Sequence, residues 1–118
     1  MNCPSCHGLM HISARSCAVC GIEVKGRFCT SRLARLPPEM LHLAEVFLLN
    51  GGNLKQLAPV LSVSYPTLRK RIDALVDTLR ALQEADQRQT AIWLQAVEHG
   101  EMTAEEAARM IREINGDS

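Results

Sequence analysis

Four of the five cysteines lie near the N-terminus in two Cys-x-x-Cys pairs. Cys3 and Cys6 form the first pair, Cys17 and Cys20 form the second, and ten residues separate the pairs. Two residues between thiols allow both sulfurs of one turn to reach the same ion, and two such turns complete a tetrahedron of thiolates. This spacing predicts a single structural Zn²⁺ ion with four cysteine ligands and no open position for catalysis.

Other uses of the thiols remain open. Four thiolates also suit an iron–sulfur centre. Disulfides suit small secreted domains, and a redox dithiol needs only one of the two pairs. The fifth cysteine, Cys29, lies nine residues beyond the last predicted ligand. We interpret it as a thiol that packs or tolerates solvent, although Arg27 and Arg32 flank it as they would a redox sensor.

Short β-prone segments must hold the two pairs in place. Residues 9–12 and 22–28 are apt to form the arms of a hairpin. Gly8 and Gly21 follow the pairs closely, where a tight turn requires a positive φ angle. A section of about thirty residues cannot bury a sufficient core, so metal would supply its stability. We therefore predict a small β zinc ribbon over residues 1–30.

The middle of the chain predicts a helix-turn-helix. Apolar residues recur at helical spacing over residues 39–49, and Asn53 caps a second helix over residues 54–61. After a three-residue break, Ser64 caps a third helix that starts at Tyr65. A short helix, a turn of three or four residues and another helix describe a helix-turn-helix. The third helix carries an apolar stripe that should face the core: Leu68, Ile72, Leu75, Leu79 and Leu82.

Two residues depart from the usual pattern of this motif. Pro59 lies inside the second helix, where it removes a backbone hydrogen bond, so we expect that helix to be kinked or shortened. Ser62 occupies the turn position at which glycine is most common. Val63, the next residue, is expected to pack in the angle between the two helices.

The third helix is the segment that would read DNA. Its core-facing stripe turns four residues outward, with Arg69 beside them: Pro66, Thr67, Lys70 and Asp73. From Asn53 to Arg71 the chain holds four basic residues and no acidic one, which makes a compact positive face. Hydroxyl groups can bond phosphate oxygens, and basic side chains can reach guanine edges or phosphates. The predicted DNA-contacting residues are Lys55, Ser64, Tyr65, Pro66, Thr67, Arg69, Lys70 and Arg71.

The last third of the chain predicts a helical hairpin. Residues 83–90 are polar and suit a helix surface or a connector, and residues 91–97 are apolar again. Thr103 and Glu106 form a capping box for a last helix with four inward residues, namely Ala107, Ala108, Ile111 and Ile114. The hairpin is too small to stand alone. It either docks on the rest of the chain or supports a homodimer, together with the heptad-like seam Leu75–Leu82.

Charge is balanced overall but unevenly distributed. Thirteen basic and thirteen acidic residues cancel, so no net charge attracts the chain to nucleic acid or membrane. Residues 1–36 hold five basic residues and one acidic residue, whereas residues 83–118 hold three basic and eight acidic ones. This asymmetry predicts a division of labour. Four basic residues of the front section are predicted to lie along DNA phosphates: Lys25, Arg27, Arg32 and Arg35.

Several classes of protein are excluded by what the sequence lacks. The most apolar stretch, residues 40–49, is about half of the length that spans a bilayer, and no secretory signal precedes the cysteines. We therefore expect a cytoplasmic protein with no membrane partner. No nucleophile–base pair, phosphate-binding loop or open metal site is present, so no enzymatic activity is expected.

The order of these motifs resembles the bacterial domain of unknown function 2089 family. The resemblance covers about residues 3–82 and rests on the cysteine pairs, on Gly26-Arg27-Phe28, on residues 33–36 and 52–55 and, most specifically, on Ser64-Tyr65-Pro66-Thr67. Members combine an N-terminal zinc ribbon with a helix-turn-helix similar to sigma-factor region four. The resemblance implies a DNA-binding regulator without naming its target. The C-terminal hairpin is similar to short helical oligomerisation modules.

The predicted fold class is mainly α, with a small N-terminal β zinc ribbon followed by a helix-turn-helix and a C-terminal helical hairpin. The predicted sections are a zinc ribbon at 1–30, a basic, proline-containing linker at 31–38, the helix-turn-helix at 39–84 and the hairpin at 85–116. The leading hypothesis is a transcriptional regulator that binds double-stranded DNA. The alternative is an adaptor that docks on the transcription apparatus, for example RNA polymerase, through ribbon and hairpin.

Overall fold

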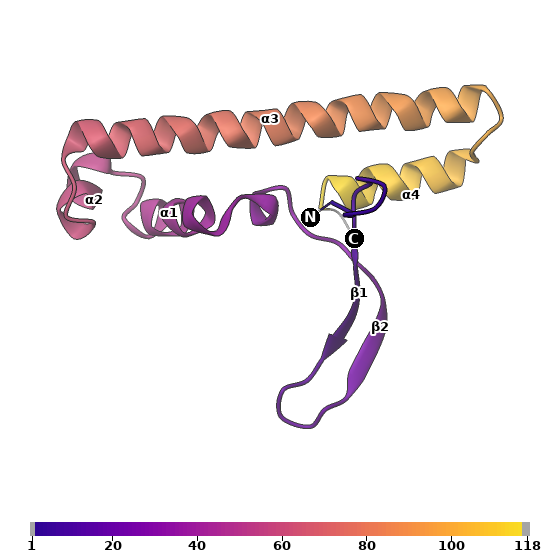
Figure 1. Ribbon diagram of the computed structural model, residues 1–118, viewed down its shortest axis with the longest axis horizontal. Helices are drawn as coiled ribbons and strands as arrows, with labels where there is room; N and C mark the ends of the chain where they lie inside the picture. The colour runs from indigo at the N-terminus through magenta and orange to yellow at the C-terminus, as the bar shows by residue number, and fades with distance from the viewer. Residues whose placement is uncertain (1, 117–118) are drawn as a thin grey trace. The chain divides into compact units, whose positions relative to one another are not determined.

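A computed structural model of the chain describes residues 2–116 (Figure 1). Met1, with which the predicted ribbon section begins, lies outside the described residues. The fold is mainly helical and has a small antiparallel sheet near the N-terminus, as predicted. In chain order the elements are β1 (Ile12–Ser16), β2 (Glu23–Phe28), the 3-10 helix η1 (Leu33–Arg35), α1 (Pro38–Leu49), α2 (Leu54–Val60), α3 (Tyr65–Glu98) and α4 (Ala104–Ile114).

The described residues divide into two units, each with its own internal contacts. The first unit comprises the residues up to Arg35 together with those from Asp86 onward, and the second is Leu36–Ala85. Helix α3 supplies residues to both units.

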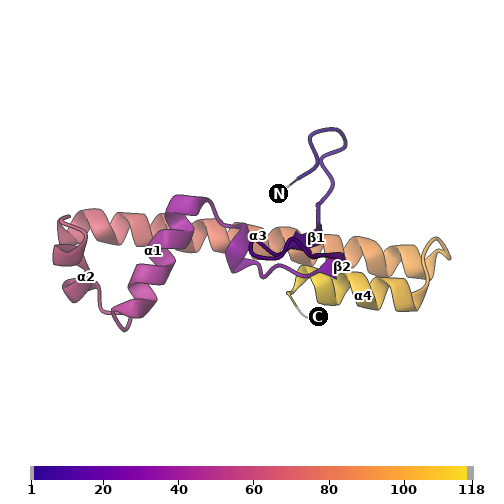
Figure 2. The ribbon, with the colours of Figure 1, turned by 90° about the horizontal axis from the view of Figure 1, so that it is seen from below.

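The second unit is the helix-turn-helix section, in which α1 and α2 pack against the first half of α3 (Figure 2). Proline at the first position of α1 costs no hydrogen bond, because the first backbone N–H groups of a helix have no partner within it. Asn53 caps α2 through its side-chain oxygen, which accepts from the backbone N–H of Lys55 at 3.0 Å. The predicted shortening of this helix is confirmed, since α2 contains Pro59 and ends at Val60.

Two clusters form the core of this unit. Leu57 and Leu68, both fully buried, join α2 to α3, and Val63 packs against them as predicted. The second cluster joins Leu75 to Ala44, and Leu79 and Leu82 pack on it. The predicted stripe of α3 therefore faces α1 and α2. The seam Leu75–Leu82, which was a candidate dimer surface, packs within the unit.

The turn between α2 and α3 depends on a backbone conformation that is unusual for serine. Ser62 has a φ angle of +55°, the left-handed region that glycine adopts without a steric penalty. Its backbone N–H donates to the carbonyl of Pro59 at 3.1 Å, and the N–H of Val63 donates to the carbonyl of Ala58 at 3.1 Å. These bonds close the end of α2 and set the direction in which α3 begins.

In the first unit, β1 and β2 form one antiparallel hairpin. Ile12 pairs with Phe28 and Ser16 with Glu23, and the register is interrupted between Ile12 and Ala14. The second arm agrees with the predicted segment 22–28. The first arm is a correction, because the strand begins at Ile12, where the predicted arm 9–12 ends.

The C-terminal part of the first unit consists of the end of α3 and the antiparallel α4, which lie side by side in both views (Figures 1 and 2). The polar residues 83–90 form part of α3. Thr103 caps α4 by accepting from the N–H of Glu106 at 3.1 Å, which confirms Thr103 as the predicted cap. The return bond from the Thr103 N–H to the Glu106 side chain, which would complete a capping box, is not formed among the described residues. Ala107 and Ile114 are buried, but Ala108 is exposed, a correction that follows from the 100° turn between successive helical residues.

Candidate functional site

The first cysteine pair lies in a tight turn that precedes β1. The backbone N–H of Cys3 donates to the carbonyl of Gly8, and that of His7 donates to the carbonyl of Cys3, both at 2.8 Å. The sequence predicts the positive φ angle of this turn at Gly8, but it belongs to His7, with a value of +62°. Glycine at position 8 avoids a tight contact, because a Cβ atom there would lie 3.3 Å from the sulfur of Cys6.

The second pair forms a turn of the same type between β1 and β2. The N–H of Gly21 donates to the carbonyl of Cys17 at 2.9 Å, and the N–H of Cys17 donates to the carbonyl of Ile22 at 2.8 Å. Gly21 has a φ angle of +76°, as expected for this turn. The N–H groups of Val19 and Cys20 point to the sulfur of Cys17, at 3.4 and 3.5 Å.

The donor chemistry of both turns fits a metal that binds thiolates. The backbone N–H of Cys6, followed by that of Ser5, lowers the pKa of the Cys3 thiol below its ordinary value. The N–H groups of Cys20 and then Val19 lower the pKa of Cys17 in the same way. Hydrogen bonds to the charged form favour it, and the thiolate is the form that binds zinc.

The structure does not bring the two cysteine pairs together. Among residues 2–116, no three side chains of cysteine, histidine, aspartate or glutamate are close enough to hold one ion. Both turns are formed separately, one before β1 and one between β1 and β2. A single ion shared by Cys3, Cys6, Cys17 and Cys20 therefore stays a prediction.

The start of α3 presents the predicted DNA-contacting side chains. Leu68 is fully buried and fixes the orientation of the helix, and all eight predicted residues from Lys55 to Arg71 are exposed. Ser64 caps the helix: its hydroxyl oxygen accepts from the N–H of Thr67 at 3.3 Å and donates to the Thr67 hydroxyl at 2.8 Å. We call the exposed side chains of Lys55, Tyr65, Thr67, Arg69 and Lys70 the basic face.

Arg69 has one acidic neighbour on its own helix. Its Nε atom lies 3.4 Å from a carboxylate oxygen of Asp73, and both side chains are more than half exposed. Exposed ion pairs of this kind contribute little to stability, so Arg69 can exchange this partner for a phosphate. Arg71 lies on a different side of the helix, where it borders a hollow against α1. The structure therefore does not group Arg71 with the basic face.

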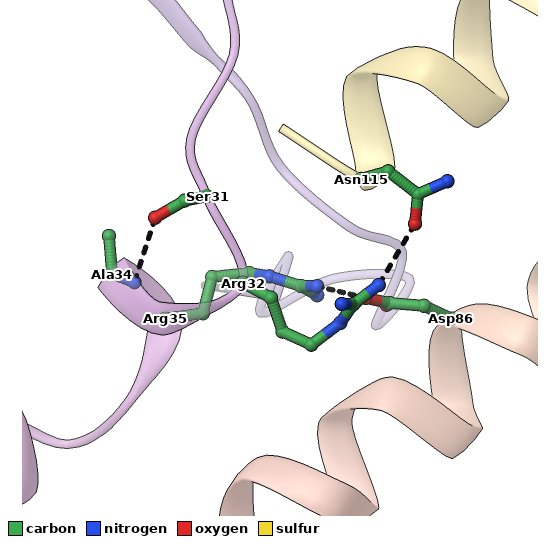
Figure 3. A network of polar contacts seen from close by, with 6 residues as sticks. All are labelled: Ser31, Arg32, Ala34, Arg35, Asp86 and Asn115. Carbon is green, nitrogen blue, oxygen red and sulfur yellow. Dashed lines mark hydrogen bonds and ion pairs between the residues drawn. The ribbon is translucent and has the colours of Figure 1, made fainter. Parts of the chain in front are cut away.

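The basic residues before α1 are engaged within the first unit (Figure 3). Arg32 donates from Nε to the Asp86 carboxylate at 2.7 Å and from Nη2 to the Asn115 side-chain oxygen at 2.9 Å. Arg35 donates to the same oxygen of Asp86, whose side chain is 5% exposed. Arg27 pairs with Glu113 at 2.9 Å. The expectation that Arg32 and Arg35 lie along phosphates is corrected, because both are largely covered and share the carboxylate of Asp86. Arg27 is exposed, so for this residue a phosphate contact stays a prediction.

Asp86 and Asn115 were not identified from the sequence. They lie 54 and 83 residues from Arg32, so no local pattern links them. A signal was nevertheless present: the excess of basic residues in 1–36 and of acidic residues in 83–118. From the sequence, this asymmetry indicates that the two ends of the chain have different functions. In the structure, basic side chains from the front section instead bind Asp86 and Asn115 from the C-terminal section. The contact of Arg32 with Asn115 joins the end of α4 to the segment before α1.

Comparison with known families matches residues 36–82 to the family model described as Domain of unknown function (DUF2089)-HTH. This match bears out the predicted resemblance over the helix-turn-helix section, and it does not extend to the cysteine pairs or to the C-terminal hairpin. Comparisons with curated proteins and with solved structures found no match. Within the described residues, no helix combines the length and the apolar composition that crossing a membrane requires.

Proposed function

We propose that this chain is a DNA-binding regulator of transcription whose basic face contacts double-stranded DNA. The observation that carries the proposal is the exposed, basic start of α3 directly after a helix-turn-helix turn. In DNA-binding proteins of this architecture, the helix after the turn enters the major groove with its N-terminal residues against the base edges. The match to a helix-turn-helix family model over residues 36–82 supports this assignment.

The proposed contacts divide by chemistry. Lys70 lies on the outward face of α3 and Arg69 beside it, so both can reach guanine edges or phosphates. Tyr65 and Thr67, at the exposed N-terminal turn of the helix, would bind phosphate oxygens. Lys55 would add a phosphate contact from α2. Arg32 and Arg35 are left out of the proposed surface, because they are engaged within the first unit.

We further propose that one structural Zn²⁺ ion is held by Cys3, Cys6, Cys17 and Cys20. Backbone N–H groups aimed at the sulfurs of Cys3 and Cys17 favour the thiolate form, which supports the assignment. When bound, the ion would join the two turns and stabilise the hairpin. Four thiolates leave no open coordination position, so the proposal includes no catalytic step.

A protein-binding adaptor is the second candidate function. The observation that favours it is the apolar surface of the β1–β2 hairpin, where Val19, Ile22 and Val24 are each more than half exposed. Such side chains suit contact with another protein, for which RNA polymerase is the proposed partner. Self-association is assigned to the C-terminal part, where Ile92 and Leu94 are more than half exposed.

Charge reversal on the basic face distinguishes the two candidates. In zinc-loaded protein, R69E combined with K70E should weaken binding to labelled duplex DNA by about a hundredfold, because two contacts become repulsive. The matched control, R80E combined with R88E, changes the charge equally at exposed arginines of the same helix outside the basic face. Equal DNA affinity of the two double variants would contradict the proposal, and retained binding to RNA polymerase by both would favour the adaptor.

A further inference from the structure

An open hollow lies within the second unit, between α1, the end of α2 and α3. Its volume is about 580 Å³, within the range of pockets that hold small molecules. Met40, Leu43, Val46 and Leu61 line it with apolar surface. These four side chains are only partly buried, although each also packs on a core cluster. The second unit therefore keeps an accessible apolar surface next to its core.

The charged side chains of the hollow differ in sign and position. Val46, near the end of α1, packs against the cluster that contains Leu68, whereas Met40, near its start, packs against the cluster that contains Leu75, so α1 and α3 run antiparallel. Arg71, between the two leucines, therefore lies level with the middle or end of α1, while Glu39 lies at its first turn. One end of the hollow is cationic and the other end is anionic.

Arg71 is available to bind a ligand. Within residues 2–116 its guanidinium group has no ion-pair or hydrogen-bond partner, in contrast to Arg27, Arg32, Arg35 and Arg69. A guanidinium group offers two parallel N–H donors that match the two oxygens of a carboxylate. An arginine next to apolar surface suits a molecule with a carboxylate head and a hydrocarbon body.

We propose that the hollow binds a small amphipathic monocarboxylate, with its carboxylate on Arg71 and its apolar part against Leu43, Val46 and Leu61. Glu39 limits the ligand to one negative charge, because a second anionic group at the far end would meet its carboxylate. His42 also lines the hollow and adds a polar edge. A hydrocarbon chain or ring fits the volume of the hollow. A diacid is excluded, because its second carboxylate would be repelled by Glu39.

The site gives the ligand a route to regulation that rests on the proposed function. Arg71 lies one residue after Lys70, at the start of the helix that is proposed to enter the major groove. A carboxylate on Arg71 neutralises a positive charge next to the basic face. The ligand should therefore weaken DNA binding, since the affinity depends on the positive charge presented to phosphates.

The binding step is tested by titrating the ¹⁵N-labelled, zinc-loaded protein with octanoate, and with octanol and octylammonium for comparison. Octanoate should shift the amide resonances of α1 and of residues 71–74 and bind at least about tenfold more tightly than either comparison compound. R71Q should weaken octanoate binding about tenfold, whereas R80Q, an exposed arginine of the same helix outside the hollow, should leave it unchanged.

A second variant tests the hollow without changing charge. Ala74 is exposed and borders the hollow, so A74F should fill the space and abolish octanoate binding while the helix persists. Octanoate affinity that is unchanged in both R71Q and A74F overturns the proposal. DNA affinity is measured separately, with and without octanoate. If octanoate binds but leaves the DNA affinity unchanged, the proposed regulation is wrong. If the protein does not bind DNA at all, the proposed function fails, while the octanoate titration still decides whether the ligand site exists.

Discussion

Residues 2–27 and residues 36–85 differ most in how much side-chain surface they bury. From Asn2 to Arg27 every side chain is exposed except that of Cys3, which is partly buried. In the helix-turn-helix section, Leu57 and Leu68 are fully buried and two apolar clusters join the three helices. Both regions have defined backbone structure, but only one has the apolar burial that stabilises a fold.

The difference indicates that the two regions depend on different interactions. The helix-turn-helix section depends on its core and tolerates changes at its surface, which leaves the basic face available for binding. The N-terminal hairpin buries no side chain between Asn2 and Arg27. Its defined interactions include the β1–β2 pairing, the two cysteine turns, the contact of Arg15 with the Phe28 ring and the ion pair of Arg27 with Glu113. We expect the first region to respond to lost apolar contacts and the second to loss of metal.

Loss of the proposed metal ligands should have the largest effect. C17S combined with C20S should abolish zinc binding, which in small zinc domains is worth on the order of 10 kcal/mol. The hairpin amides should then exchange rapidly with solvent, while the helices of residues 36–85 keep their protection. Zinc content per chain and hydrogen exchange measure the two effects.

C29S is the matched control for the metal experiment. Cys29 lies just after β2 and outside both turns, so one zinc ion per chain should remain in this variant. If the double variant without Cys17 and Cys20 keeps tightly bound zinc, the four-thiolate site is wrong.

A substitution in the core tests whether the helix-turn-helix section depends on its buried apolar contacts. L68A should lower the free energy of unfolding of the helix-turn-helix section by about 3 kcal/mol, because the fully buried side chain leaves a cavity between α2 and α3. V60A, at an exposed position of α2, should change it by less than about 0.5 kcal/mol. Urea unfolding followed by circular dichroism measures both; equal effects of the two variants would show that the cluster is not the core.

The buried carboxylate of Asp86 tests the part of the chain that joins the N-terminal segment to α4. D86N should destabilise the first unit by about 3 kcal/mol, because Arg32 and Arg35 lose their shared charged partner in a largely buried position. D77N removes an exposed carboxylate of α3 that has no ion-pair partner within residues 2–116. Hydrogen exchange of α4 distinguishes them, and equal protection in both variants would mean that the Asp86 contacts contribute nothing.

The smallest effect is expected at the turn of the helix-turn-helix. S62G should raise the free energy of unfolding by about 1 kcal/mol, because glycine adopts the observed φ of +55° without steric cost. A decrease in stability would show that the serine hydroxyl contributes more than the backbone conformation costs. The same urea experiment measures this variant, with V60A as the reference.

Local patterns predicted what short stretches of chain determine. Helical spacing and Asn53 placed α1 and α2, and Thr103 placed the start of α4. The errors arose where distant residues decide the outcome. Asp86 was assigned to a polar surface, and it is buried only because two arginines from the N-terminal section reach it.

The candidate site was predictable to a similar degree. Its basic face follows from sequence spacing around Leu68, since one buried residue fixes the direction of its neighbours on the helix. The separation of Arg71 from that face was not predictable in the same way, because it depends on where α1 packs. In the first cysteine turn, the positive φ angle was expected at Gly8 and is found at His7, because the sequence alone does not show which residue of the turn adopts it.

DNA affinity across a salt series tests the central claim most directly. With zinc-loaded, full-length protein, the logarithm of the association constant should fall linearly with the logarithm of the salt concentration. About three phosphates neutralised by Lys55, Arg69 and Lys70 of the basic face correspond to a slope of about −3. R69E combined with K70E should flatten that slope. Absence of binding at low salt, with the fold intact, or a slope that R69E and K70E leave unchanged, would contradict the proposed DNA interface.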